Sequence, residues 1–166
     1  MKNGRKAFIE TLTELAEKDP RIILIIGDVG FRFIEPYRER FPNQFINTGA
    51  AEQSMMGIAA GLARAGWKPY VYTMRNFIVF RPFEQVRNDL GFGNADVHLF
   101  GVSGSAAYSF LGHSHNVYPN KDGVDEDVAI MQMVPNMNVY EPKTEDEVKG
   151  LMLKEYNRSG PCYMVI

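Results

Sequence analysis

Short apolar runs alternate with helical stripes along the chain, and this alternation predicts the fold. In the N-terminal segment apolar residues recur at helical spacing: Phe8, Leu12, Leu15 and Ala16. The stripe ends near Pro20, because the residue before a proline disfavours helix. Ile22 to Ile26 is a continuous and mostly β-branched run. Such a run is typical of a strand covered on both faces in a parallel sheet.

The same alternation continues to the C-terminus. Further strands are expected at residues 44–47, 70–73, 97–102, 137–140 and 162–166. Further helices are expected at residues 34–41, 51–65, 77–90, 127–133 and 144–157. Thr144 and Glu147 have the spacing of a capping box at the start of the last helix. The chain is therefore predicted to adopt an α/β fold of three layers, a mostly parallel sheet flanked by helices.

Ligands in such folds bind beyond the carboxyl ends of the strands. The loops that follow Ile26, Asn47, Thr73 and Val102 are therefore the expected places for chemistry. Two histidines, His113 and His115, stand two residues apart in the last of these regions. Without a third ligand they are a weak zinc signal, so no metal site is predicted.

Composition narrows the class of protein. The 166 residues are about one domain's worth, 45% are hydrophobic and 23% are charged, as in an ordinary globular protein. A formal charge of −2 gives no electrostatic reason to expect a nucleic acid or an anionic membrane as partner. Cys162 is the only cysteine, which excludes an intrachain disulfide. With no apolar leader in residues 1–19, we expect a cytoplasmic protein.

The most informative sequence motifs lie between Asn47 and Asp89. They read NTGAAEQSMMGIAAGLA from Asn47, TMRNF from Thr73 and FEQVRND from Phe83. This wording resembles the pyrimidine-binding domain of transketolases, enzymes that use thiamine diphosphate. The resemblance implies the thiamine diphosphate-binding fold, with residues 1–166 forming a single pyrimidine-binding domain.

Glu52 carries the central expectation. From the residues alone, it is an acid in the first turn of a helix, where the helix dipole favours negative charge. The resemblance of Gly49-Ala50-Ala51-Glu52 to a family motif implies instead that Glu52 is catalytic and hydrogen-bonds the pyrimidine ring of the cofactor.

Other cofactor contacts follow from the same resemblance. Phe77 is the position implied to stack on the pyrimidine ring, although two aromatics at helical spacing, Phe77 and Phe80, are more often core residues. Met74 stands where the family commonly has another Phe, and Asp28 matches an Asp near the cofactor. Arg81 and its charged neighbours are expected to have structural or interface roles.

The resemblance also implies substrate-binding residues. His115 is implied to bind a substrate hydroxyl or transfer a proton, with His113 beside it, and Arg5 matches a phosphate contact. Arg32 is a candidate replacement for another phosphate contact, and Ser103 stands where the family has a His. These departures, with an extra stretch at about residues 116–124, imply an altered donor or acceptor.

The Gly-Asp-Gly motif that holds the diphosphate through Mg²⁺ is missing from the sequence. We therefore expect neither a diphosphate-binding domain nor a C-terminal third domain in this chain. The implied function is the second subunit of a split transketolase-like transferase, which moves a two-carbon unit from a ketose-type donor to an aldehyde or sugar acceptor. A partner subunit would supply the Mg²⁺ site, in an α₂β₂ heterotetramer. The alternatives are a 2-oxoacid donor such as pyruvate, or a non-catalytic stabilising or regulatory subunit.

Overall fold

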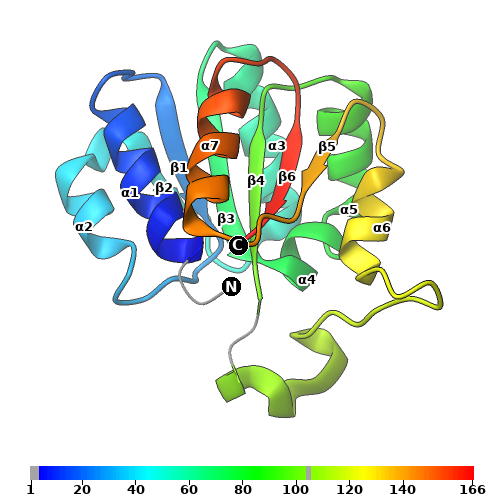
Figure 1. Ribbon diagram of the computed structural model, residues 1–166. Coiled ribbons are helices and arrows are strands. Elements are labelled where there is room, and N and C mark those ends of the chain that lie inside the picture. Colours follow the sequence, from blue (N-terminus) through cyan, green and yellow to red (C-terminus); the bar gives the residue numbers. More distant parts are fainter. Residues whose placement is uncertain (1–3, 104–105) are drawn as a thin grey trace.

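A six-stranded sheet forms the centre of the molecule (Figure 1). The structure is a computed structural model that describes residues 4–103 and 106–166. The strands are β1 (Ile22–Ile26), β2 (Phe45–Asn47), β3 (Lys68–Met74), β4 (His98–Val102), β5 (Asn138–Tyr140) and β6 (Cys162–Val165). Their order is β2-β1-β3-β4-β6-β5, and every pairing is parallel. The predicted α/β fold with a mostly parallel sheet is confirmed.

Helices cover both faces of this sheet. They are α1 (Gly4–Ala16), α2 (Glu35–Arg40), α3 (Glu52–Arg64), α4 (Arg75–Val79), α5 (Phe83–Gln85), α6 (Glu126–Gln132) and α7 (Glu145–Tyr156). Three irregular helical segments join them: the 3₁₀ turns η1 (Pro42–Gln44) and η3 (Ala106–Ser114), and the π-helical η2 (Val86–Phe92). In Figure 1, α1 and α7 lie in front of the sheet and α3 lies behind it. In the described part, no helix is both long and apolar enough to cross a bilayer.

The core has two halves, one on each face of the sheet. Leu24 of β1 packs with Phe8 of α1 on one face, whereas the next residue, Ile25, packs with Met55 of α3 on the other. All five residues of β1 are buried, because successive side chains of a strand point to opposite faces and both faces are covered. The reading of residues 22–26 as a doubly covered strand is confirmed.

One predicted helix is wrong as a single element. The expected helix at residues 77–90 begins earlier, at Arg75, and is divided into α4, α5 and η2. Pro82 lies at the break, where its ring and its missing N–H interrupt a helical ladder. The break leaves Arg81 between two short helices. The η3 turn was not predicted at all.

The capping box at Thr144 is confirmed in half. The Thr144 hydroxyl accepts a hydrogen bond from the Glu147 amide at 3.2 Å. The Glu147 carboxylate accepts from the Lys143 amide at 2.6 Å rather than from the amide of Thr144. The start of α7 is still closed on both sides by side-chain acceptors.

Asp19 fastens the entry to β1. Its carboxylate is almost fully buried and accepts hydrogen bonds from the Arg21 amide, from the Arg21 guanidinium and from the hydroxyl of Tyr156. The Arg21 hydrogen bonds lower the pKa of Asp19 to about 2 and outweigh the effect of burial, which opposes ionisation. Tyr156 is the last residue of α7, so this carboxylate links that helix to the sheet.

We expect Asp19→Asn to reduce the free energy of unfolding by about 2 kcal/mol at pH 7. A carboxylate with a depressed pKa stabilises the fold above its unfolded pKa of about 3.9, and this stabilisation is lost as the pH falls toward the folded pKa of about 2. The difference between the two proteins should therefore shrink below pH 4 in urea titrations. A difference that stays constant from pH 7 to pH 2.5, or an equal loss in the exposed control Asp122→Asn, would contradict this assignment.

Candidate functional site

Glu52 is the first residue of α3, and Arg81 holds its carboxylate. Only 5% of Glu52 is exposed, and Arg81 Nη1 donates to Glu52 Oε1 at 2.7 Å. The Arg81 side chain remains 43% exposed, so the pair lies where the protein meets solvent. A hollow of about 430 Å³ opens beside it, lined by Ala50, Ala51, Glu52, Gln53, Ser54 and Arg81. The carboxylate is thus buried but can be reached if Arg81 moves.

Arg81 also covers the ring of Phe77. The guanidinium carbon lies 3.6 Å from the centre of that ring, a cation–π contact at stacking distance. The ring of His115 meets Phe77 edge-on, with 5.0 Å between ring centres. Glu52, Arg81, Phe77 and His115 therefore form one continuous group, which we call the Glu52 cluster. Sequence reasoning placed three of these four residues in the site.

The remaining expected cofactor residues differ in their burial and contacts. Met74 ends β3 and is buried in the same half of the core as Phe77. Phe80 follows α4 and is 39% exposed. Asp28 lies in the loop after β1 with a φ of 54°, and its amide and carboxylate are hydrogen-bonded to the Asn47 side chain.

Asn76 fixes the turn that carries His115. Its side-chain nitrogen donates to the carbonyl of His113 at 3.0 Å and to the carbonyl of Asn116 at 2.9 Å. The hydroxyl of Ser114 lies 2.8 Å from Nδ1 of His115. Because Asn76 and Phe77 are neighbours in α4, one short helix both holds this turn and supplies the ring that His115 contacts.

Arg75 anchors the opposite side of the same region. Arg75 is 6% exposed, and its Nε and Nη2 atoms donate to the two carboxylate oxygens of Asp127 at 2.8 and 2.6 Å. Nη2 also donates to Asp125 at 2.7 Å, and the Tyr163 hydroxyl donates to Asp127. A side chain on Gly101 would lie 2.6 Å from the Tyr163 hydroxyl, so only glycine leaves room for this network.

The Arg75–Asp127 ion pair sets the protonation states of Arg75 and of the neighbouring Tyr163. Burial alone would lower the pKa of the Arg75 guanidinium, but the hydrogen bonds and charge of Asp127 outweigh it and raise that pKa. Burial and the neighbouring Asp127 carboxylate raise the pKa of Tyr163 well above its usual range. Arg75 is therefore a permanent cation and Tyr163 a neutral hydroxyl.

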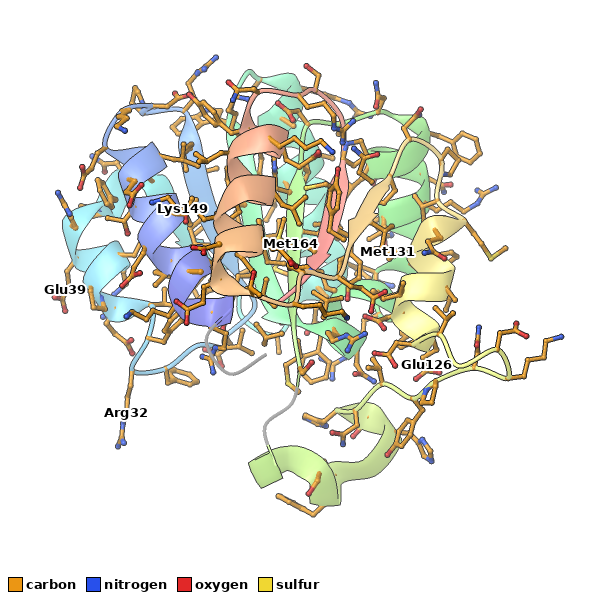
Figure 2. The ribbon with its side chains drawn as sticks, in the orientation of Figure 1. Arg32, Glu39, Glu126, Met131, Lys149 and Met164 are labelled. Atoms are coloured by element: carbon orange, nitrogen blue, oxygen red, sulfur yellow. The ribbon has the colours of Figure 1, made fainter. Side chains whose placement is uncertain are left out.

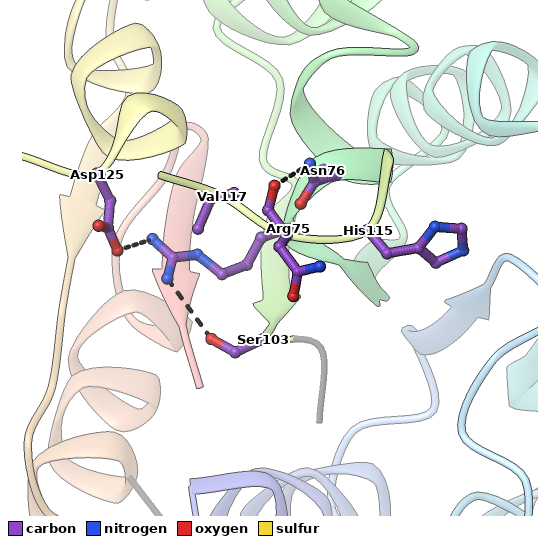
Figure 3. Close-up of a pocket in the computed structure, with 7 residues that line it drawn as sticks. Arg75, Asn76, Ser103, His115, Val117 and Asp125 are labelled. Atoms are coloured by element: carbon purple, nitrogen blue, oxygen red, sulfur yellow. Dashed lines mark hydrogen bonds and ion pairs between the residues drawn. The ribbon is translucent and has the colours of Figure 1, made fainter. Parts of the chain in front are cut away.

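A small pocket lies between this network and the His115 turn (Figure 3). Its volume is about 160 Å³, and it is lined by Arg75, Asn76, Ser103, His115, Asn116, Val117 and Asp125. Ser103 accepts a hydrogen bond from Arg75 Nη1 at 3.5 Å. The structure thus brings Ser103 and His115, which were both expected to bind substrate, to one pocket, which we call the Arg75 pocket.

The other expected substrate residues lie outside it. Arg5 donates to the Tyr72 hydroxyl at 2.8 Å and stacks on Phe33, with its guanidinium carbon 4.7 Å from the ring centre. Arg32 has a φ of 63° and points away from the body of the protein (Figure 2). The ring of His113 packs on Tyr118 at 4.7 Å.

Comparison with known proteins identifies the family. The model of the transketolase pyrimidine-binding domain matches residues 1–166. The chain belongs to this family. Transketolases are enzymes that depend on thiamine diphosphate.

Three known proteins show in which kinds of longer protein a domain similar to this chain occurs. An apulose-4-phosphate transketolase subunit of Phocaeicola vulgatus is 34% identical over 96% of this chain and 49% of its own length. The 1-deoxy-D-xylulose-5-phosphate synthase of Microcystis aeruginosa is 33% identical over 96% of this chain and 24% of its own. A solved structure, "Split gene transketolase, inactive beta4 tetramer", has a TM-score of 0.83 and 29% identity over 98% of this chain and 50% of its own. The chain spans at most about half the length of these proteins.

Sequence reasoning missed three residues of the candidate site. Arg81 was expected to be structural, yet it touches both Glu52 and Phe77. Arg75 and Asn76 were passed over within the TMRNF wording. The only available signal was a charged residue directly after a buried strand, which is an unusual place for an arginine unless acids meet it.

The buried ion pair gives a direct test of the network. Asp127→Asn removes the charge that compensates Arg75 and should lower the free energy of unfolding by about 3 kcal/mol. Asp127 and Asp146 are each the second residue of a helix, so Asp146→Asn is the matched control, and we expect a change below about 0.5 kcal/mol there. Urea unfolding measures both. Equal effects of the two changes would mean that helix position, not the pairing with Arg75, explains the loss.

Proposed function

We propose that this chain is the pyrimidine-binding half of a thiamine diphosphate-dependent transferase that moves a two-carbon unit from a ketose-type donor to an aldehyde or sugar acceptor. Residues 1–166 would act as a single pyrimidine-binding domain. One observation carries the proposal: the buried carboxylate of Glu52 and the ring of Phe77 together hold the flat, N–H-bearing guanidinium of Arg81. A planar aminopyrimidine has the same needs, a ring face and an acceptor for N–H.

The residues present fit the cofactor in this sense. Arg81 demonstrates that one planar, nitrogen-rich group can use Glu52 and Phe77 at the same time. For a pyrimidine ring to use the same face and the same carboxylate, the guanidinium has to move aside. Arg81 is 43% exposed, so it can turn toward solvent, and the N–H groups of the ring would then replace it as partners of the buried carboxylate. Ala50 and Ala51 leave space beside the carboxylate.

The cofactor, when bound, supplies a nucleophilic carbon that accepts the two-carbon unit. Within the chain, Glu52 would bind the pyrimidine ring and hold a proton on it, and Phe77 would stack on that ring. Met74 and Phe80 would line the pocket of the ring, and Asp28 would close it from the loop after β1. His115, which lies against Phe77, would exchange a proton with a substrate hydroxyl.

Substrate contacts would extend from His115 in two directions. Ser103 shares the Arg75 pocket with His115, and His113 belongs to the turn that Asn76 holds. Arg5, which donates to Tyr72 of β3, and Arg32, in the loop after β1, would bind an anionic end of the substrate.

A second polypeptide segment would complete the site. We propose that a diphosphate-binding partner subunit holds the diphosphate and Mg²⁺, and that two copies of each subunit form an α₂β₂ tetramer in the cytoplasm. The similarity to a protein named as one subunit of a transketolase, and to a split-gene transketolase, supports this arrangement. The tetramer of β chains in the latter structure is described as inactive, which supports the proposal that this chain is active only with its partner.

The donor has a second candidate class. The similarity to a 1-deoxy-D-xylulose-5-phosphate synthase supports a 2-oxoacid such as pyruvate in place of a ketose. Offering each donor to the complex with one aldehyde acceptor separates the two, because only the 2-oxoacid releases carbon dioxide.

Glu52→Gln in the complex with the partner subunit tests the proposal. The substitution removes the charge but keeps the shape, and we expect thiamine diphosphate to bind at least tenfold more weakly in calorimetric titrations with Mg²⁺, and turnover to be lost. Glu145 is the first residue of α7 as Glu52 is of α3, so Glu145→Gln is the matched control. Cofactor affinity and turnover that survive Glu52→Gln would leave the non-catalytic alternative ahead.

A further inference from the structure

We propose that the Arg75 pocket binds uncharged hydroxyl groups of the substrate and rejects phosphate. This inference rests on the proposed function, because it names the chemistry of a substrate end beside His115. An arginine at the centre of a pocket would ordinarily suggest an anion site. The inference rests instead on the balance of charges and on the number of hydrogen-bond donors left free in the pocket.

The charges around Arg75 sum to a negative value. The guanidinium carries one positive charge, and two carboxylates, Asp125 and Asp127, bind it directly. Asp127 is fully buried, whereas Asp125 keeps 34% of its side chain exposed and lines the pocket. An entering phosphate would therefore meet an exposed carboxylate, with no second arginine or lysine among the described lining residues to offset it.

Nearly all N–H groups of the Arg75 guanidinium are also already in hydrogen bonds. Of the five N–H groups of a guanidinium, two face Asp127, one faces Asp125 and one faces Ser103. One N–H remains, which is too little for the bidentate contact by which arginine binds phosphate. The two N–H groups of the Asn76 amide are used by the carbonyls of His113 and Asn116.

The polar groups still available in the pocket, on Asp125 and Ser103, suit a hydroxyl ligand. The carboxylate of Asp125 can accept a second hydrogen bond, and the hydroxyl of Ser103 accepts from Arg75, so its own proton can be donated. A substrate hydroxyl both donates and accepts, and so it can bridge these two side chains. Figure 3 shows Asp125 and Ser103 on either side of the Arg75 guanidinium.

Two walls of the pocket are held by contacts within the protein. Arg75 is locked by Asp127, and Asn76 ties the His115 turn to α4. The volume of about 160 Å³ is many times what one water needs. A preformed site of this kind selects by the chemistry of its lining rather than by closing around the ligand.

The test compares an uncharged sugar with its phosphate ester in the complex with the partner subunit. D-fructose and D-fructose 6-phosphate are titrated by calorimetry, with the cofactor present and omitted. The native complex should bind D-fructose at least as tightly as the ester. Asp125→Asn keeps the shape and the acceptor for Arg75 but removes one negative charge, so the affinity ratio should shift about tenfold toward the ester.

Asp122→Asn is the matched control, since Asp122 lies in the same loop, is exposed and does not line the pocket. We expect no change in the ratio there. A native preference for the ester of tenfold or more, or a shift below twofold in Asp125→Asn, overturns the pocket assignment. So does a failure to bind either sugar in a complex that binds the cofactor. If the ratio shifts as expected while thiamine diphosphate does not bind, the proposed function fails and the pocket chemistry stands.

Discussion

The buried pair of Arg75 and Asp127 is the interaction on which the rest of the site depends. It joins the carboxyl end of β3 to the start of α6, and Tyr163 of β6 completes it from the sheet. A charge pair out of water is stable only when nearly all of its hydrogen-bonding groups are used, which fixes its geometry. Asn76 follows Arg75 in α4, so the ion pair also fixes the position of Asn76, which holds the turn of His115.

The Glu52 cluster follows from a break in a helix. An unbroken helix through Pro82 would carry its side chains past the site in regular rotation, whereas the break leaves Arg81 in a separate segment between α4 and α5. From there the guanidinium reaches both the carboxylate of Glu52 and the face of Phe77. The contact also keeps a buried carboxylate paired in the isolated chain, where an unpaired charge would be costly.

The two parts of the site share α4 and the His115 turn but differ in character. The Glu52 cluster offers a ring face and an acceptor, which suits a planar nitrogen-bearing group. The Arg75 pocket offers a compensated cation and free acceptors, which suits hydroxyl groups. His115 lies between them, against Phe77 on one side and at the pocket on the other. This arrangement would place a proton-transferring ring between the proposed cofactor and substrate.

The sequence by itself determined the layers, the parallel sheet and the position of Glu52 at a helix start, because apolar periodicity and helix signals act over a few neighbouring residues. Its resemblance to a family also predicted site roles for Phe77, His115 and Ser103, and these roles stay predictions. The sequence did not reveal that Arg81 meets Glu52 across 29 positions, or that Arg75 meets Asp127 across 52. Such pairs leave no local pattern, since which charges meet is decided only when the strands and loops that carry them are packed together.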